Sequence, residues 1–92
     1  MTPDERRMAR HALGLVDGRT QSYRNRYFAG LGNIHEQQWN ELCRRGLAER
    51  DTNGIQTVAF FLTDAGAREA LDPGETLDPE DFPQSSSVNR ES

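Results

Sequence analysis

Residues 33–62 constrain the fold more than any other part of the chain, because they join a helical pattern to a strand pattern across one glycine. Asn33 can cap a helix at its start, and Gly46 stands where a helix ends in the left-handed conformation. The apolar residues between these two caps recur at helical spacing and share one face: Trp39, Leu42 and Cys43. We therefore expect a helix over residues 34–45.

A β-hairpin is expected after Gly46. Residues 47–51 have the pattern of a short strand, Asn53-Gly54 is typical of a tight hairpin turn, and residues 55–62 are rich in β-branched and aromatic side chains. Alternation along the longer strand puts one set of side chains on each face: Val58, Phe60 and Leu62 on the first, and Thr57, Ala59 and Phe61 on the second.

Two further helices flank this unit. A capping-box pattern at residues 2–5, with proline at the first helical position, predicts a helix over residues 3–14. Thr63 can cap a short helix over residues 64–71, which the sequence Asp72-Pro73-Gly74 ends. The expected core gathers the apolar residues of these elements: Met8, Ala12, Leu15, Trp39, Leu42, Cys43, Leu47, Val58, Phe60, Leu62 and Leu71.

Residues 19–32 fit two local structures. Tyr23, Asn25 and Tyr27 would share one side of a strand, whereas the spacing of Tyr23 and Tyr27 also suits one turn of a helix. Glycines break either element before Asn33. The sequence leaves the two conformations open.

Charge divides the chain into two parts at Leu71. Residues 1–71 hold ten arginines against nine acidic residues, a net charge of +1, whereas residues 72–92 hold one arginine against six acidic residues, a net charge of −5. Proline, serine and acidic residues dominate the second part, and such a composition buries too little apolar surface to offset its ordering entropy. We predict a folded domain over residues 1–71 and a disordered acidic tail over residues 72–92.

The composition excludes several classes of protein. No apolar run reaches the roughly 18 residues that a transmembrane helix needs, and the first residues lack the layout of a signal peptide. The single cysteine excludes an internal disulfide framework and is typical of a reducing compartment. We therefore expect a cytoplasmic protein that does not associate with membranes.

The sequence has no constellation suited to catalysis or metal binding. His11 and His35 belong to different expected elements, and no serine or cysteine stands in a nucleophile motif. His35 and Cys43 share one helical face, but eight residues of helix separate them by about 12 Å. Zinc ligands converge on one point at roughly 2.0–2.3 Å. We predict a non-enzymatic protein without a cofactor or metal.

Arginines and aromatic residues alternate near residue 25. Guanidinium groups pair with phosphates or carboxylates, and tyrosines stack on bases or anchor protein interfaces. We predict a partner-binding surface formed by Tyr23, Arg24, Arg26 and Tyr27. The alternative is that Tyr23, Tyr27 and Phe28 belong to the core and that the arginines form a solvated rim.

The polar face of the helix over residues 34–45 is a second candidate surface. Its side chains can read base edges in a DNA major groove or contact a protein: Gln37, Gln38, Asn40, Glu41, Arg44 and Arg45. Glu36 and Glu41 leave this helix with no net charge, so that a solvated face is the alternative.

The order of helix, glycine, short strand, turn, longer strand and threonine-led helix resembles a winged-helix domain. Residues 39–50, followed by Phe61-Leu62-Thr63-Asp64-Ala65-Gly66, are similar to the "helix, Gly-Leu, Arg … Leu-Thr, Gly" segment of bacterial winged-helix regulators. The resemblance implies a small α+β, winged-helix-like domain of three helices plus a β-hairpin. It also implies that residues 34–45 are the recognition helix and that Asn53-Gly54 is the wing, which carries no arginine in this chain.

A second resemblance covers more of the chain. Residues 11–15 and 23–30, together with the Gly-Leu and Leu-Thr-Asp-Ala-Gly segments, are similar to small uncharacterised proteins of tailed phages and prophages. This resemblance implies a viral origin and a location in the host cytoplasm. Phage proteins of this size include transcription regulators and inhibitors of host defence, such as anti-CRISPR proteins.

These observations give two hypotheses for the function. The first is a phage-type module that binds a host or phage protein and inhibits it, in the manner of an anti-CRISPR protein. The second is a winged-helix regulator that binds double-stranded DNA. Phosphate neutralisation supplies most non-specific DNA affinity, and a body of net charge +1 supplies little of it. We therefore favour the protein-binding function, in a monomer or a homodimer.

Overall fold

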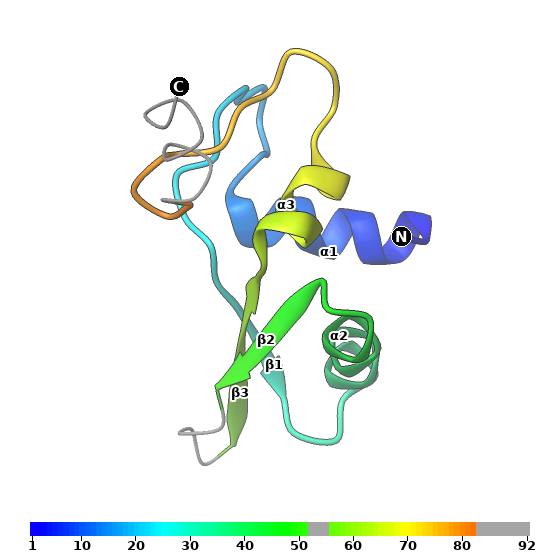
Figure 1. Ribbon diagram of the computed structural model, residues 1–92. Helices are drawn as coiled ribbons and strands as arrows, with labels where there is room; N and C mark the ends of the chain where they lie inside the picture. Colours follow the sequence, from blue (N-terminus) through cyan, green and yellow to red (C-terminus); the bar gives the residue numbers. More distant parts are fainter. Residues whose placement is uncertain (52–55, 83–92) are drawn as a thin grey trace.

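The structure of the chain is a computed structural model that describes residues 1–51 and 56–82. The described residues form three helices and three strands (Figure 1). In chain order these are α1 (Pro3–Leu13), β1 (Tyr27–Gly30), α2 (Ile34–Arg44), β2 (Ala48–Asp51), β3 (Thr57–Leu62) and α3 (Asp64–Ala70). The predicted Asn53-Gly54 turn and residues 83–92 lie outside the described residues.

Local capping chemistry sets the helix boundaries, which differ from the predicted ranges only in the last residue of each helix. At the start of α1, the Glu5 N–H donates to Thr2 Oγ1 over 3.1 Å, and the Thr2 N–H donates to Glu5 Oε1 over 2.9 Å. At the end of α2, Gly46 has a φ of +78°, and the Leu47 N–H donates to the Leu42 carbonyl over 2.9 Å. This is the glycine ending that the sequence predicts.

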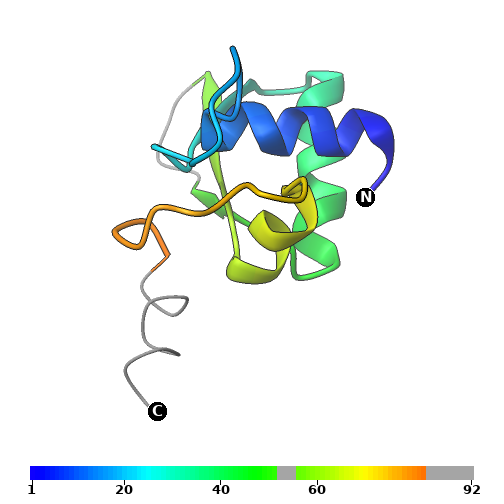
Figure 2. The same ribbon diagram turned by 90° about the horizontal axis from the view of Figure 1, so that it is seen from above.

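The strands form one antiparallel sheet in the order β1-β3-β2, in which β3 is central. Ala48 of β2 lies opposite Leu62, and Tyr27 of β1 lies opposite Phe60. All three helices lie on the same side of this sheet (Figure 2). The predicted pairing of β2 with β3 is confirmed, and β1 adds a third strand.

β1 decides between the two conformations only for part of residues 19–32. Residues 27–30 form a strand and residues 22–26 form neither a helix nor a strand, so the helical alternative is wrong and the strand alternative holds for Tyr27 but not for Tyr23 and Asn25. The cause is a long-range pairing, because each residue from Tyr27 to Gly30 has a partner among residues 57–60 of β3. A strand that depends on such a distant partner has a weak local signal.

The core lies between the helices and the inner face of the sheet. Trp39 stacks on Phe60 with ring centroids 5.4 Å apart, and both side chains are fully buried. The predicted core is confirmed for nine residues: Met8, Ala12, Leu15, Trp39, Leu42, Leu47, Val58, Phe60 and Leu62. The other two, Cys43 and Leu71, are only partly buried and pack against its edge.

A polar junction joins the Gly46-Leu47 corner to the start of α3. The Thr63 N–H donates to the Leu47 carbonyl over 3.0 Å, and the Thr63 hydroxyl donates to the Gly46 carbonyl over 2.8 Å. Thr63 Oγ1 also accepts the N–H of Gly66 over 3.1 Å. A Cβ at Gly66 would lie 1.9 Å from the Leu47 carbonyl oxygen. The junction therefore needs a hydroxyl at residue 63 and no side chain at residue 66.

Residues 72–82 lie against the folded body, past the boundary that we predicted after Leu71. Phe82 is only 5% exposed and belongs to the core cluster. The Thr76 N–H donates to the Thr20 carbonyl over 2.9 Å, and the Asp78 N–H donates to the Ser22 hydroxyl over 2.8 Å. One buried aromatic side chain and these hydrogen bonds stabilise a segment whose average composition predicted disorder.

An ion pair fixes the same segment to α1. Arg10 Nη1 and Nη2 donate to Glu75 Oε1 and Oε2, each over 2.6 Å, and this bidentate bond holds the pKa of Glu75 at about 2. With the segment included, residues 1–82 hold ten arginines against fourteen acidic residues, a net charge of −4. The folded body is therefore acidic. None of the helices in the described residues has the length and apolar character needed to cross a membrane.

The junction at Gly66 gives a first prediction. Gly66→Ala should lower the free energy of unfolding by about 2–4 kcal/mol, because the new methyl group overlaps the Leu47 carbonyl and separates α3 from β2. Urea unfolding followed by Trp39 fluorescence measures this loss. Gly30→Ala is the matched control, since its nearest neighbour, Asn33 Cβ, lies 3.8 Å away. Equal stability of the two variants would contradict the prediction.

The Arg10–Glu75 pair gives a second prediction. Because folding lowers the pKa of Glu75 from 4.5 to about 2, its contribution is complete above the unfolded pKa and is lost as pH falls between these values. Solvent screening of this partly exposed pair limits the contribution to about 1–2 kcal/mol. Glu75→Gln should lose that amount near neutral pH and approach the parent protein near pH 2 in denaturant titrations. Glu80→Gln is the matched control, and a pH-independent difference for Glu75→Gln would exclude the proposed linkage.

Candidate partner-binding site

Carboxylates neutralise most arginines of the folded body. The structure describes ten arginines, and seven of them form ion pairs: Arg6, Arg7, Arg10, Arg44, Arg45, Arg50 and Arg68. The other three are Arg19, Arg24 and Arg26, and none has an ion pair to a carboxylate within the described residues. These three arginines all belong to the segment between α1 and β1. The segment therefore carries the uncompensated positive charge of the described body.

Aromatic rings hold these three guanidinium groups. The Arg19 and Arg24 guanidinium carbons lie 4.4 and 5.2 Å from the centroid of the Tyr23 ring. The Arg26 guanidinium carbon lies 5.7 Å from the Phe28 ring centroid and 5.4 Å from that of Phe61. Stacking on a ring leaves the edge of a guanidinium group accessible to an anion. Arg24 uses part of its edge inside the protein, because its Nη2 and Nε donate to the His11 carbonyl over 2.8 and 3.2 Å.

The rings themselves are exposed. Tyr23 is 47% exposed and Phe28 is 60% exposed, so the alternative that these two residues belong to the core is wrong. We call the five residues of this stack the arginine–aromatic surface: Arg19, Tyr23, Arg24, Arg26 and Phe28. An exposed aromatic surface with uncompensated cations is typical of an interface.

Gly14 positions Tyr23. Gly14 ends α1 with a φ of +77°, and the Tyr23 ring lies so close that a Cβ on Gly14 would be 2.2 Å from a ring carbon. The Tyr23 N–H also donates to the Leu13 carbonyl over 3.1 Å. The glycine that ends the helix therefore also provides the space for the Tyr23 ring, on which Arg19 and Arg24 stack.

Asn25 fixes the backbone between the two arginines. Its Nδ2 donates to the Leu62 carbonyl over 3.0 Å, and its Oδ1 accepts the Leu62 N–H over 2.9 Å. On the opposite side, the Arg26 N–H donates to the Ala12 carbonyl over 3.1 Å. The side chain of Asn25 thus extends the pairing of β1 with β3.

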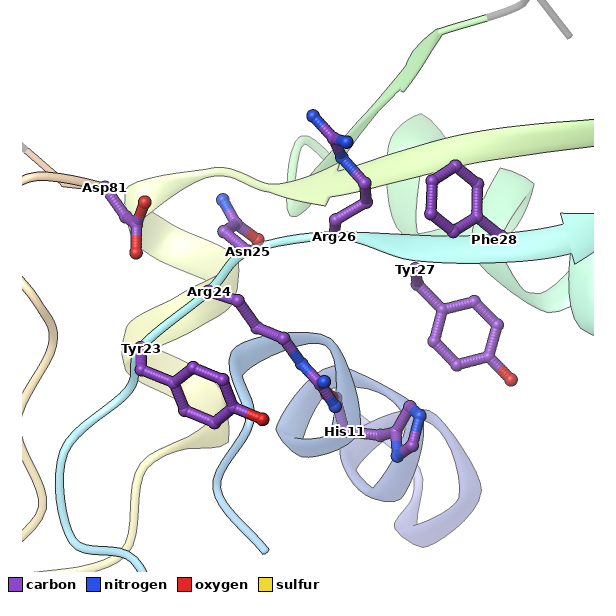
Figure 3. Close-up of a pocket in the computed structure, with 8 residues that line it drawn as sticks. All are labelled: His11, Tyr23, Arg24, Asn25, Arg26, Tyr27, Phe28 and Asp81. Atoms are coloured by element: carbon purple, nitrogen blue, oxygen red, sulfur yellow. The ribbon is translucent and has the colours of Figure 1, made fainter.

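Four residues of the arginine–aromatic surface, all except Arg19, line one open groove of about 690 Å³ (Figure 3). Its lining brings together all four residues that the sequence predicted for this surface: Tyr23, Arg24, Arg26 and Tyr27. Four further residues complete the lining: His11, Asn25, Phe28 and Asp81. Arg26 and Phe28 project from the side of the segment opposite to His11 and Tyr27 (Figure 3). Asp81 lies at one end, where burial and the carboxylates of Asp78 and Glu80 raise its pKa.

Tyr27 connects this groove to the core. Its ring centroid lies 5.3 Å from that of Trp39, its hydroxyl is hydrogen-bonded to His35 Nδ1 over 2.8 Å, and burial raises its pKa. Tyr27 therefore packs at the edge of the core and is not a freely exposed contact residue. A second groove of about 490 Å³ shares Tyr27 and His11 with the first and also contacts Met8, Ile34 and Gln38.

The structure does not bring the polar residues of α2 together as a free surface. Glu41 pairs with Arg44 and Arg45, and the hydrogen bond from Arg44 lowers the pKa of Glu41. Arg45 also pairs with Glu5 of α1 at 2.7 Å. Of the remaining residues, Asn40 accepts a hydrogen bond from Arg50 over 2.6 Å, Gln38 lines the second groove, and Gln37 is exposed. Both arginines of this face thus form ion pairs with carboxylates of the same chain.

Sequence reasoning did not single out four contributors to the site: Gly14, Arg19, Phe28 and Asp81. Phe28 follows Arg26 at strand spacing, which was the signal that both face the same way. Gly14 and Asp81 gave no local signal, because their neighbours in the site are distant in the sequence. Within residues 1–51 and 56–82, no group of three or more histidine, cysteine, aspartate or glutamate side chains could hold a metal ion.

Comparisons of the chain with protein-family models, with curated proteins and with solved structures give no match.

The dependence of Tyr23 on Gly14 gives a third prediction. Gly14→Ala should shift the Tyr23 ring resonances and destabilise the protein by about 2–3 kcal/mol, because it adds a clash to the strain of a positive φ. Aromatic NMR spectra and urea unfolding measure the two effects. Gly74→Ala is the matched control, since its φ is +88° but nothing lies within 4 Å of an added Cβ. If both variants leave the Tyr23 resonances unchanged, Gly14 does not position this ring.

Proposed function

We propose that this protein is a non-enzymatic binding module whose arginine–aromatic surface contacts an acidic surface of a protein partner. The observation that supports this function is the uneven pairing of the arginines. Seven arginines of the described body have carboxylate partners, and the three that lack one are stacked on aromatic rings. Two of these three, Arg24 and Arg26, line one groove. A partner that supplies carboxylates there would gain charge-assisted hydrogen bonds to preorganised guanidinium groups.

The charge of the body favours a protein partner over double-stranded DNA. Residues 1–82 have a net charge of −4, which disfavours approach to a phosphate backbone. The arginines of α2, the expected recognition helix, are engaged with Glu41 and Glu5. Reading a base edge through Arg44 or Arg45 would first break these pairs. Both observations argue against DNA binding through α2.

The winged-helix relationship and the phage-type origin are part of the same proposal. The order of α1, β1, α2, β2 and β3 is compatible with a winged-helix frame in which no helix stands between β1 and α2. The resemblance to small phage proteins directs the search for the partner to defence proteins in the host cytoplasm. An inhibitor of the anti-CRISPR type would use the arginine–aromatic surface to occupy an acidic site on such a protein.

Charge reversal at the surface gives a fourth prediction. Arg24→Glu and Arg26→Glu should each weaken the complex with the partner by at least about tenfold, because they replace attraction by repulsion at a carboxylate. Asp81→Asn should strengthen it, since Asp81 is the acidic residue that lines the groove. Capture from nuclease-treated host lysate, followed by calorimetric titration of the purified partner, measures these affinities.

Arg44→Glu is the matched control, because Arg44 is an exposed arginine on α2, outside the groove. It should leave the affinity unchanged. The DNA hypothesis predicts the reverse order, with salt-sensitive gel retardation that depends on Arg44 and Arg45. A complex that nuclease abolishes, or one in which Arg44→Glu weakens binding more than Arg26→Glu does, would refute the protein-binding function.

A further inference from the structure

The outer edge of β1 offers unpaired backbone groups. Leu31 donates its N–H to the Gln56 carbonyl over 3.1 Å, and Gly30 lies opposite Thr57. In an antiparallel ladder, alternate residues direct both backbone groups toward the partner strand. Tyr27 and Ala29 therefore face β3, whereas Phe28 and Gly30 direct their N–H and C=O groups to the outside of the sheet.

Two hydrogen bonds bound this free edge. The Arg26 N–H donates to the Ala12 carbonyl over 3.1 Å, and the Gly30 carbonyl accepts the Asn33 N–H over 3.0 Å. Between them lie the Arg26 carbonyl, both backbone groups of Phe28 and the Gly30 N–H. None of these four groups has a hydrogen-bond partner within residues 1–51 and 56–82. The free edge, residues 26–30, is thus long enough to pair with a short extended peptide.

The side chains next to this edge are accessible to a partner. The three helices lie on one side of the sheet, so no helix of the described residues covers the other face (Figure 2). Arg26 and Phe28 point away from Tyr27, toward this uncovered face (Figure 3). Phe28 lies opposite Ala59, a small residue that leaves the phenyl ring 60% exposed. The two grooves, which share His11 and Tyr27, border the same segment and leave space beside it.

We infer that an extended acidic segment of the partner binds to this edge as a fourth strand of the sheet. The inference rests on the proposed function and specifies how the partner binds. The free backbone groups would supply the hydrogen bonds that recur in strand addition, and the uncompensated arginines select carboxylates rather than basic side chains.

The register of the edge specifies the peptide. The residue opposite Phe28 would exchange both backbone hydrogen bonds with it and place its own side chain beside the phenyl ring. Because side chains alternate along a strand, the residue two positions away lies on the same face, opposite Arg26. The expected sequence is therefore an apolar residue separated by one position from an acidic residue.

A library of random short linear peptides, sorted against the full chain, tests the inference. Enriched peptides should contain the apolar and acidic pair at this spacing, and their binding should slow hydrogen exchange of the Phe28 and Gly30 amides. Arg26→Gln should weaken the binding by about tenfold, whereas the matched change Arg44→Gln should not. N-methylation of the peptide residue opposite Phe28 should abolish binding, and N-methylation of the next residue, whose N–H points away from β1, should be tolerated.

Several outcomes would overturn the strand addition. Failure to enrich any peptide, enrichment of peptides without acidic residues, and binding that leaves exchange at Phe28 and Gly30 unchanged would each do so. In the last case, a loss of affinity in Arg24→Glu and Arg26→Glu would still uphold the proposed function. Protection of the same amides that rises with protein concentration, together with a dimer in sedimentation, would assign the edge to a second copy of this chain instead.

Discussion

The backbone carbonyl of Leu47 is the point at which four elements of the structure meet. It lies between the end of α2 and the start of β2, and it accepts the N–H of Thr63 between β3 and α3. Gly66 approaches it so closely that no side chain fits. This contact fixes where β2 begins relative to β3, and the register of β3 in turn places β1. The candidate site next to β1 therefore depends on a junction at the start of β2, the strand at the opposite edge of the sheet.

The same junction explains why the pairing of Gly-Leu with a later Leu-Thr-x-x-Gly is informative in a sequence. Each of these residues has a steric or hydrogen-bonding role in one contact, and the helix caps have similar local causes. Such local rules predicted α1, α2, β2, β3 and α3 closely. β1 and the segment up to Phe82 have non-local causes. β1 forms because β3 offers a partner, and the C-terminal segment is fixed by Arg10 and by Phe82 in the core.

The candidate site shows the same division. The alternation of arginine and aromatic residues was visible in the sequence, and Tyr23, Arg24 and Arg26 do line one groove. Which arginines remain without a carboxylate could not be predicted, because pairs such as Arg10 with Glu75 join residues 65 positions apart. Nor could the sequence show that the ring of Tyr27 would be held against Trp39. Charge counts along a chain describe composition, whereas recognition depends on the charge that remains after internal pairing.

The position of Phe82 in the core has a consequence for synthesis on the ribosome. The chain emerges from its N-terminus, so α1 and the sheet are available before the residue that completes their packing. Until Phe82 has left the exit tunnel, its place in the core is empty and Arg10 lacks Glu75. The nascent chain must therefore pass through a stage in which apolar surface is open to chaperones and proteases. Packing of the core can therefore be completed only after residues 72–82 have emerged.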